Sequence, residues 1–415
     1  MTPRSAAAAA LRASMAELVL KKGMLTGLSV CYGNTQHCSG ESVGLAREVH
    51  WENGEFRDAP AKIDKNSLYD IASLTKLFTL VAALQLIHRG KMAFEDPVGR
   101  LDKRFSALQD CRLMDLMSYE AVLKTPERVD AQPNAESAMR QVFLTYRARE
   151  EGARLYSDMN ALVLKYLVET VTGQPFGLYL EYNVFGPLNM RETFVSVPPE
   201  RRGNLLDYNH EHHIVDDRFF VLDQNTPGLP HDPKARMLSE NGENLSGHAG
   251  LFSTSGDMCQ FAMGLLSGTI LPENMVNLIG QNRTGRIGEG RYRQYMGLIC
   301  FSKSPVRRLS EVPPWMGERA FALSGYTGNH IAIDPELGVF DLFLGNRCHN
   351  RLSLVEPPGA AADLGLSEDG SGEVIWPDGR RVKSSFQYVH HKDAMLHAPV
   401  YDCLKSAGWL GNERA

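Results

Sequence analysis

Apolar segments of strand length gather near the two ends of the chain, and longer apolar helices lie between them. The strand-like segments are 28–32, 48–51, 319–323, 330–334 and 339–344. Turns that contain glycine and proline join the last three segments. Because the strand segments flank a helical middle, the pattern predicts an α+β fold, an α/β sandwich whose antiparallel sheet takes strands from both chain ends.

The middle of the chain predicts an inserted, mainly helical lobe over about residues 92–255. Before it, a helix that starts at Ser73 and stops at Gly90 is apolar on almost every side, which indicates burial. We expect one domain over 1–350 that includes this lobe. An extension over 351–415, with a hairpin and a closing helix, is expected to pack on that domain.

Composition narrows the class of protein. The 415 residues carry a formal net charge of −5 with both signs interspersed, so neither nucleic acid nor an anionic membrane is expected as a partner. The seven scattered cysteines predict reduced thiols. The first 22 residues predict an amphipathic surface helix, and their longest apolar run, 6–11, is too short for a signal-peptide core or a membrane span. We therefore expect a cytoplasmic protein of undetermined oligomeric state.

A serine and a lysine stand three residues apart where an extended segment meets the buried helix. Of all the serines, only Ser73 has a lysine, Lys76, at the third place after it. Residues at this spacing share a helix face, so the amine can reach the hydroxyl and act as the base that a serine nucleophile needs. Burial of the helix predicts a lowered pKa for Lys76.

Two later segments offer the remaining groups of such a site. Tyr156 precedes Asp158 and Asn160 in a loop ahead of an apolar helix, and its phenol could accept the serine proton if Lys76 holds it near ionisation. Farther on, a strand ends in small residues, where a substrate can lie along the edge and a backbone N–H can face an oxyanion. This strand end has the sequence Leu323-Ser324-Gly325-Tyr326.

These three elements, in this order and spacing, resemble the serine-reactive penicillin-binding-protein and β-lactamase superfamily, and most of all its class C branch with related esterases and D-aminopeptidases. The segments 68–76, 246–254 and 334–336 also resemble that branch. The resemblance implies a β-lactamase/transpeptidase-like fold, a Ser73 nucleophile and no cofactor or metal. It implies proton transfer by Lys76 and Tyr156, and a positioning role for Asp158 or Asn160.

The resemblance also implies that Ser324 and Gly325 border the substrate, and that the N–H groups of Ser73 and Tyr326 hold the oxyanion. Leu323 departs from the family, which usually has lysine or histidine there to anchor a substrate carboxylate. This departure favours an uncharged ester or amide over a penicillin. The class A arrangement, in which 157–158 would begin a Ser-Asp-Asn motif, fits less well because a tyrosine directly precedes the pair.

We therefore predict a serine hydrolase that cleaves an ester or amide bond of a small molecule through an acyl-enzyme. An acyltransferase with the same intermediate and a non-catalytic sensor on the same fold are the alternatives.

Two further clusters of charged residues have plainer interpretations. His210, His212, His213 and His231 lie among aspartates, and a polar loop over the pocket is a better explanation than a metal site. His248 is interpreted as structural. The cluster at 390–397 predicts a solvated surface, with lining of the pocket entrance as the lesser alternative.

Overall fold

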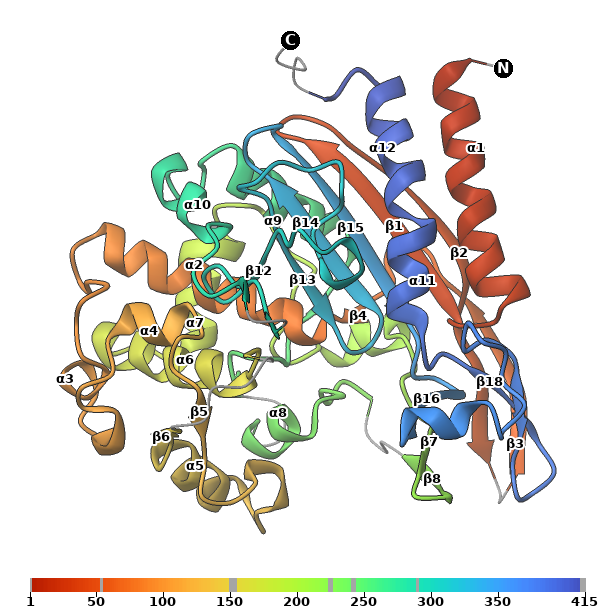
Figure 1. The fold of residues 1–415 in the computed structure, drawn as a ribbon, viewed down its shortest axis with the longest axis horizontal. Helices are drawn as coiled ribbons and strands as arrows, with labels where there is room; N and C mark the ends of the chain where they lie inside the picture. The colour runs from red at the N-terminus through yellow and green to blue at the C-terminus, as the bar shows by residue number, and fades with distance from the viewer. Residues whose placement is uncertain are drawn as a thin grey trace.

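A seven-stranded antiparallel sheet forms the centre of the molecule in the computed structural model, which describes residues 2–52, 55–148, 155–222, 227–239, 244–288 and 291–410 (Figure 1). Its strand order is β12-β13-β14-β15-β1-β2-β3. The bounds are β1 Gly27–Asn34, β2 Cys38–Glu52, β3 Glu55–Lys62, β12 Phe301–Ser302, β13 Phe321–Gly325, β14 Asn329–Asp334 and β15 Val339–Asn346. Strand β1 pairs with β15, so the sheet joins the two chain ends and the α+β prediction is confirmed.

The central strands β1 and β15 follow their apolar sequence, whereas β2, one strand in from the edge, does not. All eight residues of β15 and seven of eight in β1 are buried, because helices cover both faces of the sheet there. Strand β2 is 15 residues long, although only 48–51 has strand character in the sequence. Most of its residues are exposed or half-buried, so its polar positions hide its length.

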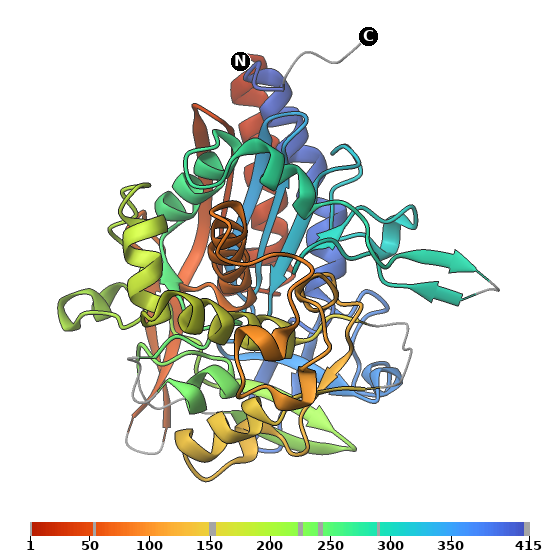
Figure 2. The same cartoon turned by 90° about the vertical axis from the view of Figure 1, so that its left-hand side faces the viewer.

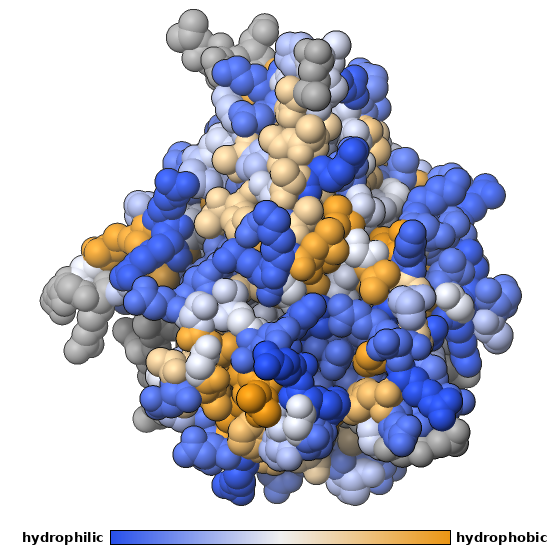
Figure 3. All heavy atoms as spheres, turned by 90° about the vertical axis from the view of Figure 1, so that its right-hand side faces the viewer, coloured by the Kyte–Doolittle hydropathy of each residue, from blue (hydrophilic) through white to orange (hydrophobic). Residues whose placement is uncertain are grey.

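Helices cover the sheet on both sides. On one side α1 Pro3–Ala16 packs beside α12 His397–Ser406, and α11 Tyr388–Met395 precedes α12 (Figure 1). On the other side lie α2 Thr75–His88 and α9 Ser255–Leu266, and the helical lobe extends away from them (Figure 2). The face that carries α1 and α12 is mostly hydrophilic, with scattered apolar patches (Figure 3).

The lobe consists of short helices and small strand pairs. Its helices are α3 Val98–Leu101, α4 Leu113–Met117, α5 Ala135–Phe143, α6 Asp158–Thr172, α7 Phe176–Leu180 and α8 Pro233–Leu238, and α10 Glu273–Ile279 follows α9. The remaining short strands are β4 Tyr69–Asp70, β5 Leu123–Lys124, β6 Tyr146–Arg147, β9 Phe252–Ser253, β10 Arg286–Gly288 and β11 Arg291–Arg293. No helix in the described ranges has the length and apolar character that a membrane span requires.

A second sheet connects the lobe with the C-terminal segment. Its order is β17-β18-β16-β7-β8, with β7 Glu211–Val215, β8 Arg218–Leu222, β16 Arg351–Glu356, β17 Glu373–Ile375 and β18 Arg381–Ser384. Strand β16 runs parallel to β7, so chain after residue 350 pairs directly with chain from the lobe. The buried Arg351 binds Glu48 of β2 through two hydrogen bonds of 2.7 and 2.8 Å and ties this sheet to the large one.

Candidate active site

Ser73 stands at a tight elbow between β4 and α2. Ala72 before it has φ 46°, in the left-handed region that residues with a Cβ rarely occupy. The carboxylate of the buried Asp70 holds this elbow, because it accepts hydrogen bonds from the backbone N–H of Ala72 at 2.9 Å and of His231 at 2.6 Å. Ala72 and Leu74 are buried while Ser73 is partly exposed and borders a cavity. The elbow thus places Ser73 at the wall of the cavity.

Lys76 lies fully buried behind Ser73. Its Nζ donates to Ser73 Oγ at 2.8 Å and to the backbone carbonyl of His248 at 3.0 Å, and it lies 2.9 Å from Asp158 Oδ1. Burial alone would lower the pKa of Lys76, but the negative charge of Asp158, with a further contribution from Tyr156, outweighs it and raises this pKa above its ordinary value. The prediction of a lowered pKa is therefore wrong. At neutral pH Lys76 is an ammonium group that donates to the serine.

Tyr156 borders the same cavity with its ring stacked on Phe301, at 5.4 Å between centroids. Its backbone N–H donates to Gln294 Oε1 at 3.0 Å, and Lys76 Nζ lies 5.1 Å from its ring centroid. Burial raises the pKa of the phenol, and attraction to Lys76 together with contacts to Lys76 and Ser73 lowers it only in part. The phenol is neutral at rest, so the expectation that it stands near ionisation is wrong.

Asp158 links two lysines at the cavity wall. Its carboxylate oxygens lie 2.9 Å from Lys76 Nζ and 2.9 Å from Lys234 Nζ. Burial would raise the pKa of Asp158, but Lys76, His248 and Lys234 hold it well below its usual range. His248 in turn contacts Asp232 at 2.8 Å through Nε2. The backbone carbonyl of His248 accepts from Lys76 and the contact with Asp232 fixes the ring, in agreement with a structural role for His248.

Two of the residues proposed for substrate contact lie elsewhere. Asn160 is buried, and its Nδ2 donates to the carbonyls of Leu116 at 2.8 Å and Ala121 at 3.3 Å, so it fixes the preceding loop of the lobe. Leu323 is buried in the main core between the sheet and the helices. Neither side chain is part of the described cavity wall. The expectation of a direct role for Asn160 at Lys76 or the substrate is corrected accordingly.

The end of β13 forms the edge opposite Ser73. Ser324, Gly325 and Tyr326 all border the cavity. Ser324 Oγ donates to Glu311 Oε2 at 2.6 Å. A Cβ on Gly325 would lie 3.0 Å from the carbonyl oxygen of Ile71, next to the elbow. Glycine is therefore required at position 325, where β13 runs close to the elbow that carries Ser73.

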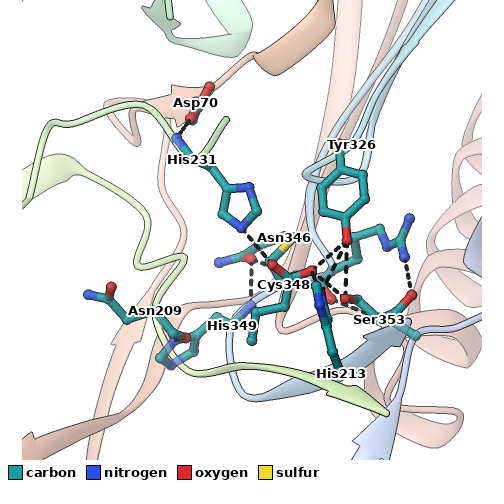
Figure 4. A network of polar contacts seen from close by, with 12 residues as sticks. Asp70, Asn209, His213, His231, Tyr326, Asn346, Cys348, His349 and Ser353 are labelled. Carbon is teal, nitrogen blue, oxygen red and sulfur yellow. Dashed lines mark hydrogen bonds and ion pairs between the residues drawn. The ribbon is translucent and has the colours of Figure 1, made fainter. Parts of the chain in front are cut away.

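A buried carboxylate organises the far wall of the cavity (Figure 4). Glu211 on β7 receives hydrogen bonds from Tyr326 Oη at 2.9 Å and from Ser353 Oγ, and lies 2.8 Å from His231 Nε2 and 3.2 Å from His213 Nε2. Burial would raise the pKa of Glu211, but the hydrogen bonds from the two histidines hold it well below its usual range. This network fixes the ring of Tyr326, whose backbone is proposed to face the oxyanion. The sequence gives no local signal for Glu211.

The histidine-rich segment is divided between cavity and core. His213 and His231 border the cavity, as a polar segment over the pocket requires. His212 is buried and packs edge-on against Trp376 at 4.5 Å between centroids, and His210 is buried as well. Burial is the largest cause that lowers the pKa of His212, to about 3, so this ring is neutral.

Three groups of side chains in the described ranges have donor atoms close enough to surround a metal ion. Their members are Glu211, His231 and Cys348; His330, Asp341 and His397; and Asp158, Asp232 and His248. Each group already contains a close histidine–carboxylate pair, at 2.8, 2.9 and 2.8 Å respectively. These internal pairs account for the clusters.

Two members of the charged cluster at 390–397 are buried and do not belong to the solvated surface that its sequence predicts, whereas His390 is exposed. Lys392 and His397 keep only 1% and 4% of their side-chain surface exposed. Lys392 Nζ lies 3.2 Å from His330 Nδ1 and 3.6 Å from Glu311 Oε2. The cluster therefore lies beneath the Ser324 end of the cavity, between α11 and the large sheet.

The cavity has a volume of about 780 Å³ and draws its wall from the elbow, the lobe, both sheets and α11. Its polar side chains come from the elbow, the lobe and both sheets, and apolar ones such as Phe301, Val221 and Leu222 line the rest. A small molecule of moderate size fits this space. A hydroxyl, an ammonium and a phenol meet at one end of it, which is the set of groups that acyl transfer through a serine requires.

The chain matches the family model described as Beta-lactamase over residues 39–363. Among curated proteins it is 25% identical over 335 residues to a protein of Salmonella gallinarum with the provisional name D-alanyl-D-alanine carboxypeptidase, covering 70% of this chain and 72% of that one. It is 26% identical over 343 residues to an N-acetylmuramyl-L-alanine amidase of Bacillus subtilis, covering 72% of each.

Two solved structures share the fold. Simvastatin synthase (LovD) from Aspergillus terreus, in a mutant form, superposes with a TM-score of 0.62 at 16% identity and covers 97% of both chains. EstCE1, described as a hydrolase with promiscuous acyltransferase activity, has a TM-score of 0.62 at 18% identity and covers 83% of this chain and 94% of its own. The family match spans the elbow, most of the cavity wall and β13, and so confirms the resemblance seen in the sequence. The chain belongs to the Beta-lactamase family and is a serine hydrolase of that family.

Proposed function

We propose that the protein cleaves an ester or amide bond of a small molecule, with Ser73 as nucleophile and Lys76 and Tyr156 as the groups that move its proton. The observation that carries this proposal is the 2.8 Å contact between Lys76 Nζ and Ser73 Oγ at the wall of a cavity that Tyr156 also borders. The names of the curated relatives, a carboxypeptidase and an amidase, support cleavage of acyl bonds.

In the first half of the reaction Ser73 Oγ attacks the carbonyl carbon while its proton passes to the Lys76–Tyr156 pair. The N–H groups of Ser73 and Tyr326 hold the oxyanion, and each such donor contributes roughly 3 kcal/mol to barrier lowering. Collapse of the tetrahedral intermediate breaks the bond to the leaving alcohol or amine, which takes the proton. Water then attacks the acyl-enzyme and gives a proton to the same pair. The pair returns this proton to Ser73 Oγ as the acyl bond breaks, which releases the acid and restores the serine hydroxyl.

The electrostatics of the resting site limit how often the pair can accept a proton. Because the pKa values of both Lys76 and Tyr156 are raised, the form with one proton fewer is a minority at neutral pH. Ser73 therefore reacts when the pair is in this minority form. Because the fraction of that form increases with pH, acylation accelerates as pH rises.

A fluorophosphonate probe tests the proposal directly. Wild-type protein is expected to be labelled at Ser73 and to hydrolyse short-chain p-nitrophenyl esters, and Ser73→Ala is expected to lose both activities. Ser302→Ala is the matched control, because this buried serine adjoins Phe301 and its hydroxyl has no hydrogen-bond partner among the described residues. Absence of labelling in folded wild-type protein would favour the sensor alternative and refute the proposal.

An acyltransferase would use the same acyl-enzyme and differ only in the acceptor. EstCE1 is described as having both activities, although the likeness to it concerns the fold alone. Product analysis with and without an added alcohol or amine separates the two. Hydrolysis is expected to remain the main outcome, and a product that is mostly the transferred ester or amide would assign a transferase instead.

A further inference from the structure

We propose that the corner of the cavity formed by Ser324 and Glu311 is a subsite for a substrate group that donates hydrogen bonds, with an ammonium group as its best ligand. This inference rests on the proposed function and adds a substrate class to it. It reverses the polarity expected at the third motif, where related proteins usually place a cation and this chain has the buried Leu323.

The hydrogen bonding of Ser324 decides what its hydroxyl can offer. A hydroxyl has a single proton, and Ser324 Oγ donates it to Glu311 Oε2 at 2.6 Å. The remaining neighbour of this oxygen is His330 Nδ1 at 3.0 Å, on the side away from solvent. An ionised carboxylate accepts but never donates, so toward the cavity both Ser324 and Glu311 present acceptors. A ligand group at this corner must therefore bring the proton.

The charges behind this corner leave one negative charge in excess. Lys392 and His397 are held as cations, since burial lowers their pKa values but nearby carboxylates raise them overall. Lys392 Nζ lies 2.6 Å from Asp393 Oδ1, and His397 Nδ1 lies 2.9 Å from Asp341 Oδ2. These two cations balance Asp393 and Asp341. The third carboxylate of this group belongs to Glu311. It lies 3.6 Å from Lys392 Nζ, farther than Asp393 does.

The remaining titratable group, His330, does not supply the missing positive charge. Its pKa lies well below its ordinary value because it is buried and also faces Lys392 and His397. His330 is therefore neutral between the cation of Lys392 and the hydroxyl of Ser324. The excess negative charge stays on Glu311.

Access together with incomplete charge compensation singles out Glu311 from the other carboxylates at the cavity. Its side chain is 20% exposed, whereas that of Glu211 is 1% exposed and closed in by its four partners. Asp158 is held between two lysines, and Asp232 pairs with His248. Glu311 combines an open face with incomplete charge compensation, which is what recognition of a cation requires.

A series of matched esters tests the inference. The p-nitrophenyl esters of 3-aminopropanoate, butanoate and succinate differ at one end only, which is an ammonium, a methyl or a carboxylate group. A longer series, made from 6-aminohexanoate, heptanoate and adipate, places the same three end groups farther from the ester. In at least one series wild type is expected to favour the ammonium ester over the methyl ester by about ten- to a hundredfold in kcat/KM, the effect of one charge-assisted hydrogen bond. The carboxylate ester should be the poorest.

The variants locate the preference. In Glu311→Gln the ratio of ammonium to methyl ester is expected to fall toward one, and in Ser324→Ala it should fall in part. Glu318→Gln is the matched control, because Glu318 has an 85% exposed side chain that pairs with Lys303 on the surface, and it should keep the wild-type ratio. Should Glu311→Gln not fold, competitive inhibition of wild type by hexylamine, hexanol and hexanoate gives an independent answer, with hexylamine expected to bind most tightly.

The outcomes separate this inference from the proposed function. Turnover of methyl esters without preference for the ammonium esters overturns the subsite and leaves the serine hydrolase intact. The subsite is also overturned if Glu311→Gln keeps the wild-type preference for ammonium over methyl esters, or if hexanoate is the strongest inhibitor. Failure of Ser73 to react with fluorophosphonate overturns both.

Discussion

Replacing Asp158 by asparagine should move the pH dependence of acylation to lower pH. Asp158 is the largest cause that raises the pKa of Lys76, and it also raises that of Tyr156. Asparagine keeps the shape of the side chain and removes its charge. Burial then dominates, and the pKa values of Lys76 and Tyr156 should both fall.

The structure sets the size of this effect. Unit charges 2.9 Å apart attract by about 6 kcal/mol at an effective dielectric constant of about 20, or about four pKa units. The side chain of Asp158 is 24% exposed and is shared with Lys234, so solvent and the second lysine screen part of this attraction. We expect about half of the shift, a fall of about two units.

The rate of fluorophosphonate labelling between pH 6 and 10 measures acylation without a deacylation step. For wild type the rate should rise about tenfold per pH unit through neutrality, because the deprotonated pair is the reactive form. For Asp158→Asn the rate at pH 7, relative to that at pH 10, should be higher. Asp102→Asn is the control, since Asp102 is also buried and paired, with Arg104 at 2.6 Å, but lies in the lobe away from Lys76. A wild-type plateau below pH 8, or an unshifted Asp158→Asn profile, would refute the reasoning.

Three further predictions concern the walls of the cavity. Glu211→Gln should destabilise the protein by about 2 kcal/mol at pH 7, since it weakens hydrogen bonds to a buried charge. Because the folded pKa of Glu211 lies below its ordinary value of 4.5, this contribution is present above that pH and is lost as pH falls through the folded value, so urea titrations at pH 7 and pH 4 should give a smaller difference at pH 4. Gly325→Ala should slow labelling of Ser73 at least about tenfold while leaving the fold intact by circular dichroism, because its Cβ would press on the Ile71 carbonyl beside the elbow. A chromogenic cephalosporin should be cleaved weakly or not at all, since Leu323 provides no cation to anchor its carboxylate. Rapid cleavage would show that no cation is needed at this position.

The parts of the site that the sequence predicts are those fixed by local geometry. Ser73 and Lys76 lie three residues apart in one helical turn, so their contact follows from the helix itself. The sheet follows from apolar strands at both chain ends, whose burial on both faces leaves a strong signal. The length of β2, which lies between β1 and the edge strand β3, was not predicted because most of its residues are exposed or half-buried and show no apolar alternation.

The direction of the Lys76 pKa could not be read from the helix alone. A buried amine without partners has a lowered pKa, and the apolar helix indicates burial correctly. The sign is decided by Asp158, which is 82 residues away in the sequence and 2.9 Å away in the structure. The same holds for Glu211 and Lys234, which have no local pattern and gain their roles from partners on other elements.

The cluster at 390–397 shows how charged residues that predict a solvated surface can be buried. Charged residues on a short helix normally face water, because burial of an unpaired charge is too costly to survive. Lys392 and His397 are tolerated inside because Asp393, Asp341 and Glu311 surround them with opposite charge, and two of these carboxylates come from the large sheet and the loop before β13. The C-terminal segment thus completes the wall beneath Ser324, and the polarity of that corner depends on residues that the three motifs do not include.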